Sequence, residues 1–130
     1  MTDVVVDASA MVDALAGTAL GPVVTDRLRD HTLHAPAHFD AEVLSALGRL
    51  QRAGALSARQ VRTRLQRLQA APIKRHLLAP LLTGAWRRRH NLPLVDALYA
   101  QLADDLGVPL VTTDSGLAVA APNGELIELP

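Results

Sequence analysis

Short apolar runs along the chain predict five β-strands. The clearest is 3–6, where three consecutive valines lead into Asp7, and a second run, "PLVTTD" at 109–114, also ends on an aspartate. Three weaker runs complete the set: "TLHAP" at 32–36, "IKRHL" at 73–77 and the closing "ELIEL" at 125–129. Each run is short enough for a strand and too short for a typical helix.

Amphipathic stretches between these runs predict helices. We expect helices at 8–16, 20–30, 38–53, 57–70, 79–90 and 94–106, and a short one before the last strand. Gly17, Gly54 and Gly107 end three of them, and Ser57 with Gln60 forms a capping box at the start of another. Strands that alternate with helices predict an α/β fold with a mainly parallel central sheet.

Length and composition narrow the class of protein. The chain has 130 residues, 49% of them hydrophobic, so residues 1–130 are expected to form one domain with a real core. It has no cysteine, which excludes disulfides and thiolate metal sites. No apolar run reaches the ~18 residues of a membrane span. We therefore expect a cytoplasmic protein without membrane attachment.

The basic residues are concentrated in one segment, although the formal net charge is zero. No acidic residue occurs between Glu42 and Asp96. That interval holds 11 of the 13 basic residues: Arg49, Arg52, Arg59, Arg62, Arg64, Arg67, Lys74, Arg75, Arg87, Arg88 and Arg89. Such segregation favours a surface for a polyanion. The alternative is that these side chains only solvate helix faces.

Four acidic residues occupy positions that a purely structural role would not favour. Asp7 and Asp114 each follow an apolar strand, at the edge of the sheet where α/β proteins bind ligands. Glu42 is expected in the middle of helix 38–53, on or beside its apolar face. Asp96 opens helix 94–106 on its inward face. Helix capping is an alternative explanation for each aspartate, but not for Glu42.

Four inward carboxylates would repel one another unless a cation compensates them. No lysine or arginine is adjacent to any of the four in the sequence. A hard divalent cation, Mg²⁺ or Mn²⁺, suits oxygen ligands of this kind. Such a cation can activate water and stabilise displacement at phosphorus, and a basic surface could hold a phosphodiester backbone. The four carboxylates and the basic segment together predict a nuclease.

Several stretches of the chain resemble PIN-domain ribonucleases, in particular the VapC-type toxins of toxin–antitoxin pairs. They are "VVVDASAMVDAL" (4–15), "HFDAEVLSALGRL" (38–50), "LPLVDALYAQLADDLGVPLVTTD" (92–114) and "ELIEL". The resemblance assigns the family's acidic quartet to Asp7, Glu42, Asp96 and Asp114 as metal-binding and catalytic residues. It also places supporting hydroxyl groups at Ser9 and Thr112.

The resemblance further implies a three-layer α/β/α sandwich that dimerises and cleaves RNA with Mg²⁺, or with Mn²⁺ as a substitute. It implies inhibition by a cognate VapB-like antitoxin. One position departs from the family pattern: a basic residue often follows the last aspartate, whereas this chain continues with "SGL" after Asp114. A phosphate contact at that position is therefore not expected.

Other interpretations remain open from the sequence. His31, His34 and His38 could suggest zinc, although Pro36 interrupts their spacing and no cysteine assists. A receiver-like phosphoacceptor domain also gathers acids at strand ends, but it needs a nearby lysine and the only lysine is Lys74. A non-catalytic RNA- or protein-binding domain could keep the fold without the chemistry.

Overall fold

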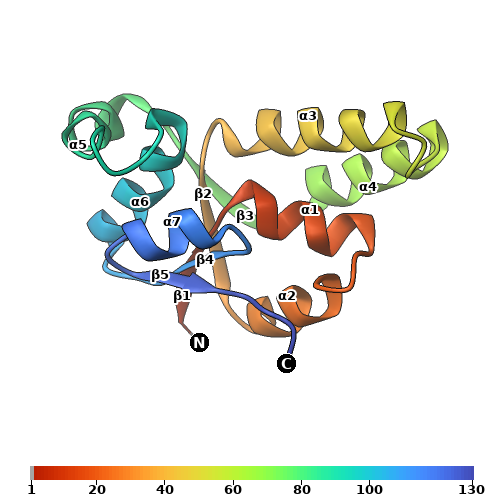
Figure 1. Ribbon diagram of the computed structural model, residues 1–130, viewed down its shortest axis with the longest axis horizontal. Coiled ribbons are helices and arrows are strands. Elements are labelled where there is room, and N and C mark those ends of the chain that lie inside the picture. The colour runs from red at the N-terminus through yellow and green to blue at the C-terminus, as the bar shows by residue number, and fades with distance from the viewer. Residues whose placement is uncertain (1) are drawn as a thin grey trace.

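The computed structural model describes residues 2–130, which build a parallel sheet in the order β3-β2-β1-β4-β5 (Figure 1). The strands are β1 (Asp3–Val6), β2 (Thr32–Pro36), β3 (Ile73–His76), β4 (Leu110–Thr112) and β5 (Gly124–Leu126). Every pairing among them is parallel. The predicted α/β class is confirmed, and the described sheet is wholly parallel.

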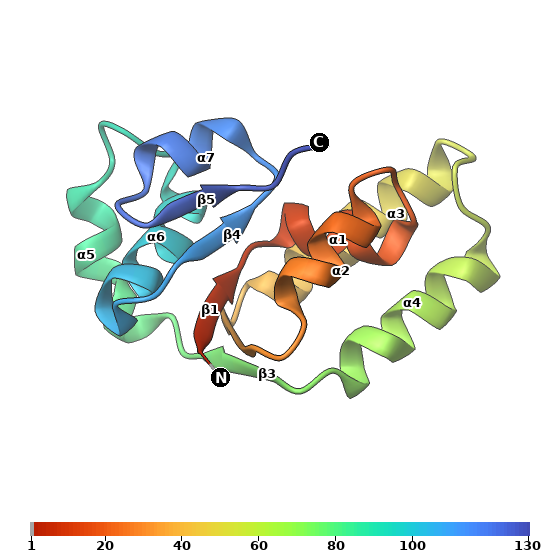
Figure 2. The same ribbon diagram turned by 90° about the horizontal axis from the view of Figure 1, so that it is seen from below.

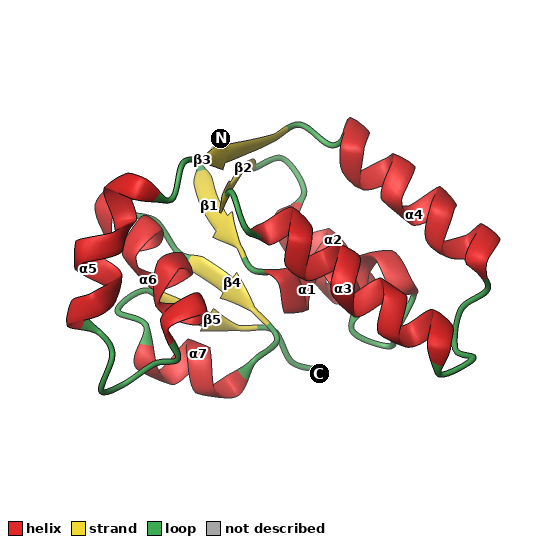
Figure 3. Cartoon of the chain, turned by 90° about the horizontal axis from the view of Figure 1, so that it is seen from above, coloured by secondary structure: helices red, strands yellow, loops and turns green. Residues whose placement is uncertain are grey.

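Helices cover both faces of this sheet. They are α1 (Ala8–Ala16), α2 (Gly21–Leu28), α3 (Phe39–Arg52), α4 (Ala58–Ala70), α5 (Leu82–Arg87), α6 (Leu94–Leu106) and α7 (Ser115–Ala120). Figure 3 shows α1 to α4 gathered on one side of the sheet and α5 to α7 on the other. The view from below shows α4 at the outer edge of its layer, far from α5 and α7 (Figure 2). The three-layer sandwich implied by the resemblance is confirmed.

Burial explains why these segments take these positions. The three valines of β1 are at most 1% exposed, and the β4 residues Leu110 and Val111 are fully buried. On α3, Phe39, Val43 and Leu47 recur at helical spacing and are all fully buried. Each such side chain contributes roughly 1.5–3 kcal/mol by leaving water. The central strands are therefore rigid, and they hold the residues that directly follow them in fixed positions.

Three predicted strands are shorter than expected, the run 73–77 by its last residue only. The run 109–114 forms a strand only over its middle three residues, because Pro109 has no N–H and the chain turns toward α7 after Thr112. The run 125–129 is replaced by β5, which begins one residue earlier and ends at Leu126.

The predicted helix 79–90 is also broken up. A 3-10 turn at Ala79–Leu81 precedes α5, and α5 ends at Arg87. At that end the amide of Arg88 bonds to the carbonyl of Ala85, three residues back, which tightens the last turn. The helix predicted at 20–30 ends at Leu28, because the backbone of Arg29 has an extended ψ of 137°, and Asp30 then takes a left-handed φ of 64°.

The direction of chain winding reverses between β1 and β4. From β1 the chain adds β2 and β3 on one side, and then crosses to add β4 and β5 on the other. Such a reversal leaves a crevice at the carboxyl ends of the two strands, where α/β proteins bind ligands. Asp7 follows β1 and Asp114 follows β4 by two residues, so both lie at this crevice.

No single helix within residues 2–130 is long and apolar enough to span a membrane. Only α1 and α2 taken together, which meet at a bend of 117°, satisfy that test by length and composition.

Candidate active site

Asp7 is buried at the carboxyl edge of the sheet and held there by hydrogen bonds. The residue is 4% exposed. Oδ1 accepts a hydrogen bond from the amide of Ala10 at 3.0 Å and so caps α1. Oδ2 accepts from Thr112 Oγ1 at 2.8 Å, and Ser9 Oγ lies 2.9 and 2.8 Å from the two oxygens. Asp7 therefore does cap a helix, but capping engages only one of its oxygens.

Burial raises the pKa of the Asp7 carboxyl from 3.8 to about 6, and the negative charge of Asp114 adds to the rise. Hydrogen bonds from Ala10, Thr112 and Ser9 act in the opposite direction. At neutral pH the group is mainly ionised, so its charge costs folding free energy. A cation placed beside it would reduce this cost.

Ser9 and Thr112 both contact Asp7 and connect the start of α1 to the end of β4. Thr112 is fully buried, and its Oγ1 also accepts a hydrogen bond from the amide of Asp114 at 2.9 Å. Ser9 Oγ accepts from Thr113 Oγ1 at 3.1 Å. These bonds fix the Asp7 carboxylate in one orientation.

Asp114 and Asp96 both begin helices and present carboxylate oxygens to the crevice. Asp114 caps α7, where its Oδ1 accepts from the amides of Gly116 at 2.9 Å and Leu117 at 3.3 Å. Asp96 lies in the first turn of α6. Burial raises its pKa, followed by the charges of Asp114 and Glu42. Among residues 2–130, no hydrogen-bond donor reaches Asp114 Oδ2 or either oxygen of Asp96.

Glu42 corrects one sequence prediction. We expected it in the middle of its helix, on or beside the apolar face, but α3 begins at Phe39, so Glu42 lies in the first turn, with its side chain 33% exposed. Tyr99 Oη donates a 2.6 Å hydrogen bond to Glu42 Oε1, and His38 Nε2 lies 3.5 Å from the same atom. Burial and the Glu42 charge together raise the pKa of the Tyr99 phenol, which therefore stays a donor.

The structure brings all four predicted acids to one pocket of about 390 Å³. They are Asp7, Glu42, Asp96 and Asp114. A larger hollow of about 940 Å³, between α2 and the end of the chain, contains none of them. The smaller pocket is the candidate site because the carboxylates with raised pKa values line it.

Three further residues of this pocket were missed by the sequence reasoning. Asp13 lies one turn beyond Ser9 on α1 and accepts from Thr113 Oγ1 at 2.8 Å. Tyr99 is the partner of Glu42, although its position on the inward face of its helix had suggested only a core role. Among the residues that the structure describes, Arg49 is the only basic one that lines the pocket. It lies seven residues, and so two turns, after Glu42, a spacing that could have indicated the shared face.

The donor set suits a hard divalent cation better than any soft metal, because it consists of carboxylate oxygens alone. Within residues 2–130, however, no three acidic or histidine side chains converge closely enough to hold an ion directly. The free oxygens of Asp96 and Asp114 fit a cation that keeps several of its waters, as Mg²⁺ does. Burial raises the pKa of Asp96, the nearby charges of Asp114 and Glu42 raise it further, and a cation between these carboxylates would offset both effects.

The three histidines considered for zinc lie in separate environments. His31 bonds to Thr2 and Arg27, and His34 Nδ1 lies 2.8 Å from His76 Nε2. His38 Nε2 lies 3.0 Å from the carbonyl of Val95, with its ring against Tyr99. Within the part of the chain that the structure describes, these three side chains do not converge on one position. Lys74 does not line the acidic pocket, which also disfavours a receiver-like domain.

Comparison with known proteins agrees with this geometry. A family model of the PIN domain matches residues 4–122. Ribonuclease VapC3 of Mycobacterium tuberculosis is 56% identical over 125 residues, which is 95% of this chain and 91% of that protein. Ribonuclease VapC1 of the same organism is 42% identical over 122 residues, 92% of each chain.

Solved structures show the same fold. PAE2754 of Pyrobaculum aerophilum superposes with a TM-score of 0.70 at 25% identity, over 95% of this chain and 82% of that one. Mycobacterium tuberculosis VapC20, a sarcin-ricin loop cleaving toxin, superposes with a TM-score of 0.69 over 98% of this chain and all of that one. Its sequence identity is only 16%, so it supports the fold alone. The chain belongs to the PIN domain family, in its VapC-type branch.

Proposed function

We propose that this protein is an endoribonuclease that depends on Mg²⁺, or Mn²⁺ in its place, and acts as the toxin of a toxin–antitoxin pair. The observation that carries the proposal is the pocket in which Asp7, Glu42, Asp96 and Asp114 meet at the crevice between β1 and β4. The names of its VapC relatives support RNA as the substrate. RNA cleavage by this chain is itself the hypothesis to be tested.

Each acid has a role that its surroundings suggest. Asp96 and Asp114, whose carboxylates keep free oxygens, would hold the cation, with Asp7 as the buried and rigid member of the set. When bound, the cation lowers the pKa of the attacking water and stabilises the charge that develops at phosphorus. Glu42 keeps Oε2 free while Tyr99 holds Oε1, so it can orient the water and accept its proton.

Arg49 would bind the RNA beside the reacting phosphate. Its Nη1 donates to Ser45 Oγ at 2.9 Å, and it forms no ion pair with any described acid of the pocket. A guanidinium can contact a phosphate through two parallel hydrogen bonds. Since Arg49 lies two turns along α3 from Glu42, it would contact a phosphate near the cleaved one, not the cleaved one itself.

The proposal extends to partners and place of action. A VapB-like antitoxin would block the pocket, the toxin would act as a homodimer, and its RNA substrates would be cytoplasmic. Co-purification with the antitoxin and the molar mass in solution test the two assemblies.

The decisive experiment is RNA cleavage by purified protein with Mg²⁺, followed by sequencing of the new 5′ ends. We expect Asp7→Asn and Asp96→Asn to abolish cleavage. Asp105→Asn should keep it, because Asp105 is an exposed acid near the far end of the same helix, α6. If the native protein binds RNA without cleaving it, or if Asp7→Asn cleaves normally, a non-catalytic binding domain is the better interpretation.

A further inference from the structure

The structure separates the clustered basic residues into those with a structural partner and those without one. Arg64 donates to the carbonyl of Leu15 at 3.1 Å, and Arg75 makes two hydrogen bonds to Asp40. Arg88 pairs with Asp104 at 2.8 Å, and Arg89 lies 4.7 Å from the ring centre of Trp86. These side chains are already engaged in the fold.

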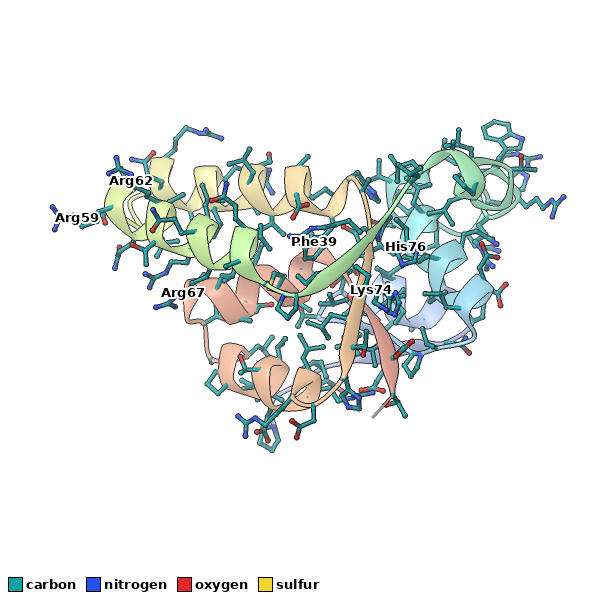
Figure 4. The ribbon with its side chains drawn as sticks, turned by 180° about the vertical axis from the view of Figure 1, so that it is seen from behind. Phe39, Arg59, Arg62, Arg67, Lys74 and His76 are labelled. Carbon is teal, nitrogen blue, oxygen red and sulfur yellow. The ribbon has the colours of Figure 1, made fainter. Side chains whose placement is uncertain are left out.

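A second group of basic residues lies on the outer face of α4. Arg59, Arg62 and Arg67 are exposed, and none forms an ion pair with any described residue. Figure 4 shows them directed away from the body of the molecule. Lys74, exposed on the edge strand β3, follows beyond the end of α4 (Figure 4). We call the three arginines of α4 and Lys74 the α4 basic face.

This arrangement costs helix stability. Arg59 lies in the first turn of α4, where the helix dipole disfavours positive charge. Arg59 and Arg62 are like charges three residues apart, and α4 has no acid to offset them. Even its capping box uses Gln60 where a glutamate would serve equally well. A purely solvated helix face would gain stability from acids, so their absence points to a binding role.

The acidic pocket creates a need for such a surface. Five carboxylates and one guanidinium line it, so without a cation it repels a phosphate backbone. The formal net charge of the chain is zero and gives no general attraction either. No residue of α4 lines the pocket. A separate basic surface would therefore add attraction for the parts of a long polyanion that lie outside the pocket.

The chemistry of the α4 basic face favours a nucleic acid over a protein partner. Gln66 and Gln69 are exposed beside its arginines, so this side of the helix offers hydrogen-bond donors and charge. The apolar hollow that Leu44, Leu65 and Leu68 line lies between α3 and α4, and only Gln69 of the exposed outer residues borders it. Protein–protein interfaces usually need buried apolar or aromatic anchors, whereas phosphate-binding surfaces are polar and positively charged. From Arg59 to Arg67 the helix rises about 12 Å, which spans several phosphates of one strand.

We propose that the α4 basic face binds the phosphate backbone of RNA outside the catalytic pocket, on segments that flank the cleaved one. The identity of the polyanion as RNA rests on the proposed function. The assignment of the α4 basic face as a binding surface rests on its unpaired arginines and on the helix stability that they cost. The face supplies affinity and holds the substrate, and takes no part in bond cleavage.

The test measures RNA binding by the Asp7→Asn protein, so that cleavage does not interfere. The probes are a fluorescent RNA hairpin and an unstructured RNA of equal length, each titrated in 50–200 mM KCl. The triple variant R59Q/R62Q/R67Q should bind at least tenfold more weakly at 100 mM KCl. The magnitude of the slope of log K against log salt should fall by about 2 for the unstructured RNA and by nearly 3 for the hairpin, as expected for three lost phosphate contacts. Its melting temperature should be unchanged or higher, because the arginines repel one another.

The charge-matched control is R29Q/R87Q/R89Q, which removes the same charge from exposed arginines that directly follow α2 or lie at and just beyond the end of α5. Arg29 pairs with Asp26 and Arg89 lies against Trp86, so stability is measured beside RNA binding for this variant as well. It should weaken RNA binding less than threefold. Equal losses in the two triple variants would show a net-charge effect and overturn the proposal. Normal RNA binding, or weaker binding only of polyglutamate or of the antitoxin, would overturn it in favour of an acidic protein partner.

The outcome is separable from that of the proposed function. If the native protein cleaves no RNA but the α4 variant still loses RNA affinity, the nuclease assignment fails and the binding surface stands. If cleavage is confirmed, the α4 variant should raise KM at least tenfold with kcat nearly unchanged. A large fall in kcat with unchanged KM would contradict a role outside the pocket.

Discussion

The buried charge of Asp7 makes a quantitative prediction: Asp7→Asn should stabilise the metal-free protein while abolishing its activity. The pKa of Asp7 is about 6 in the folded protein and 3.8 without burial. At 1.36 kcal/mol for each tenfold change in proton affinity, ionised Asp7 costs the fold about 3 kcal/mol. Asparagine removes the charge, can still accept from the amide of Ala10, and can donate to Thr112.

The stability difference between Asp7→Asn and the native protein should change with pH in a defined direction. Because the folded pKa is raised, the folded state binds the proton more tightly, and the native protein gains stability as the pH falls from about 6 toward 3.8. The advantage of Asp7→Asn should therefore be largest at high pH. The linkage relation gives a stabilisation by Asp7→Asn of about 3 kcal/mol at pH 7.5 and about 1 kcal/mol at pH 4.5. These are upper values, because an amide oxygen forms weaker hydrogen bonds than a carboxylate oxygen.

The assay is urea denaturation in EDTA at both pH values, for the native protein, Asp7→Asn and Asp26→Asn. Asp26 is an exposed acid whose side chain is 75% exposed, so its variant should change the free energy of unfolding by no more than about 0.5 kcal/mol. A destabilised Asp7→Asn protein at pH 7.5, or a gain that does not vary with pH, would falsify the burial argument.

Three further predictions concern the pocket. Mg²⁺ at ten times its dissociation constant should stabilise the native protein by about 1.4 kcal/mol in thermal unfolding, and Asp7→Asn should lose most of this gain. Tyr99→Phe should cost about 1–2 kcal/mol in urea denaturation and lower kcat, because Glu42 loses its 2.6 Å hydrogen bond; an unchanged kcat would contradict the positioning role. Arg49→Gln should raise KM for RNA several-fold, whereas Arg52→Gln, on the same helix but outside the pocket, should raise it less.

Positions at the ends of strands are predictable from the sequence for a physical reason. A parallel sheet brings the carboxyl ends of its strands to one edge, so a carboxylate after each of two neighbouring strands must lie near the other. Asp7 and Asp114 satisfy this condition through their apolar runs alone. Asp96 could be placed by helical periodicity, which identifies the inward face of a helix well.

Pairings between distant side chains were not predictable. Periodicity shows which face of a helix is buried but not which side chain lies opposite. Tyr99 and Glu42, 57 residues apart, had no local signal for their hydrogen bond. The same limit applies to the arginines: nothing in the sequence distinguishes Arg64, which bonds to a backbone carbonyl, from the exposed Arg62. The start of α3 was predicted one residue too early. Glu42 lies in the first turn of this helix, whereas we expected it in the middle.

The double use of Asp7 and Asp114 as helix caps couples the pocket to local backbone opening. Their carboxylates hold the amides of Ala10 and Gly116. Any ligand that draws these carboxylates toward itself must therefore alter how often the first turns of α1 and α7 fray. Hydrogen exchange at these two amides would report occupancy of the pocket without any turnover. It would also reveal whether loss of activity in an Asp114 variant reflects a missing ligand or an unwound helix.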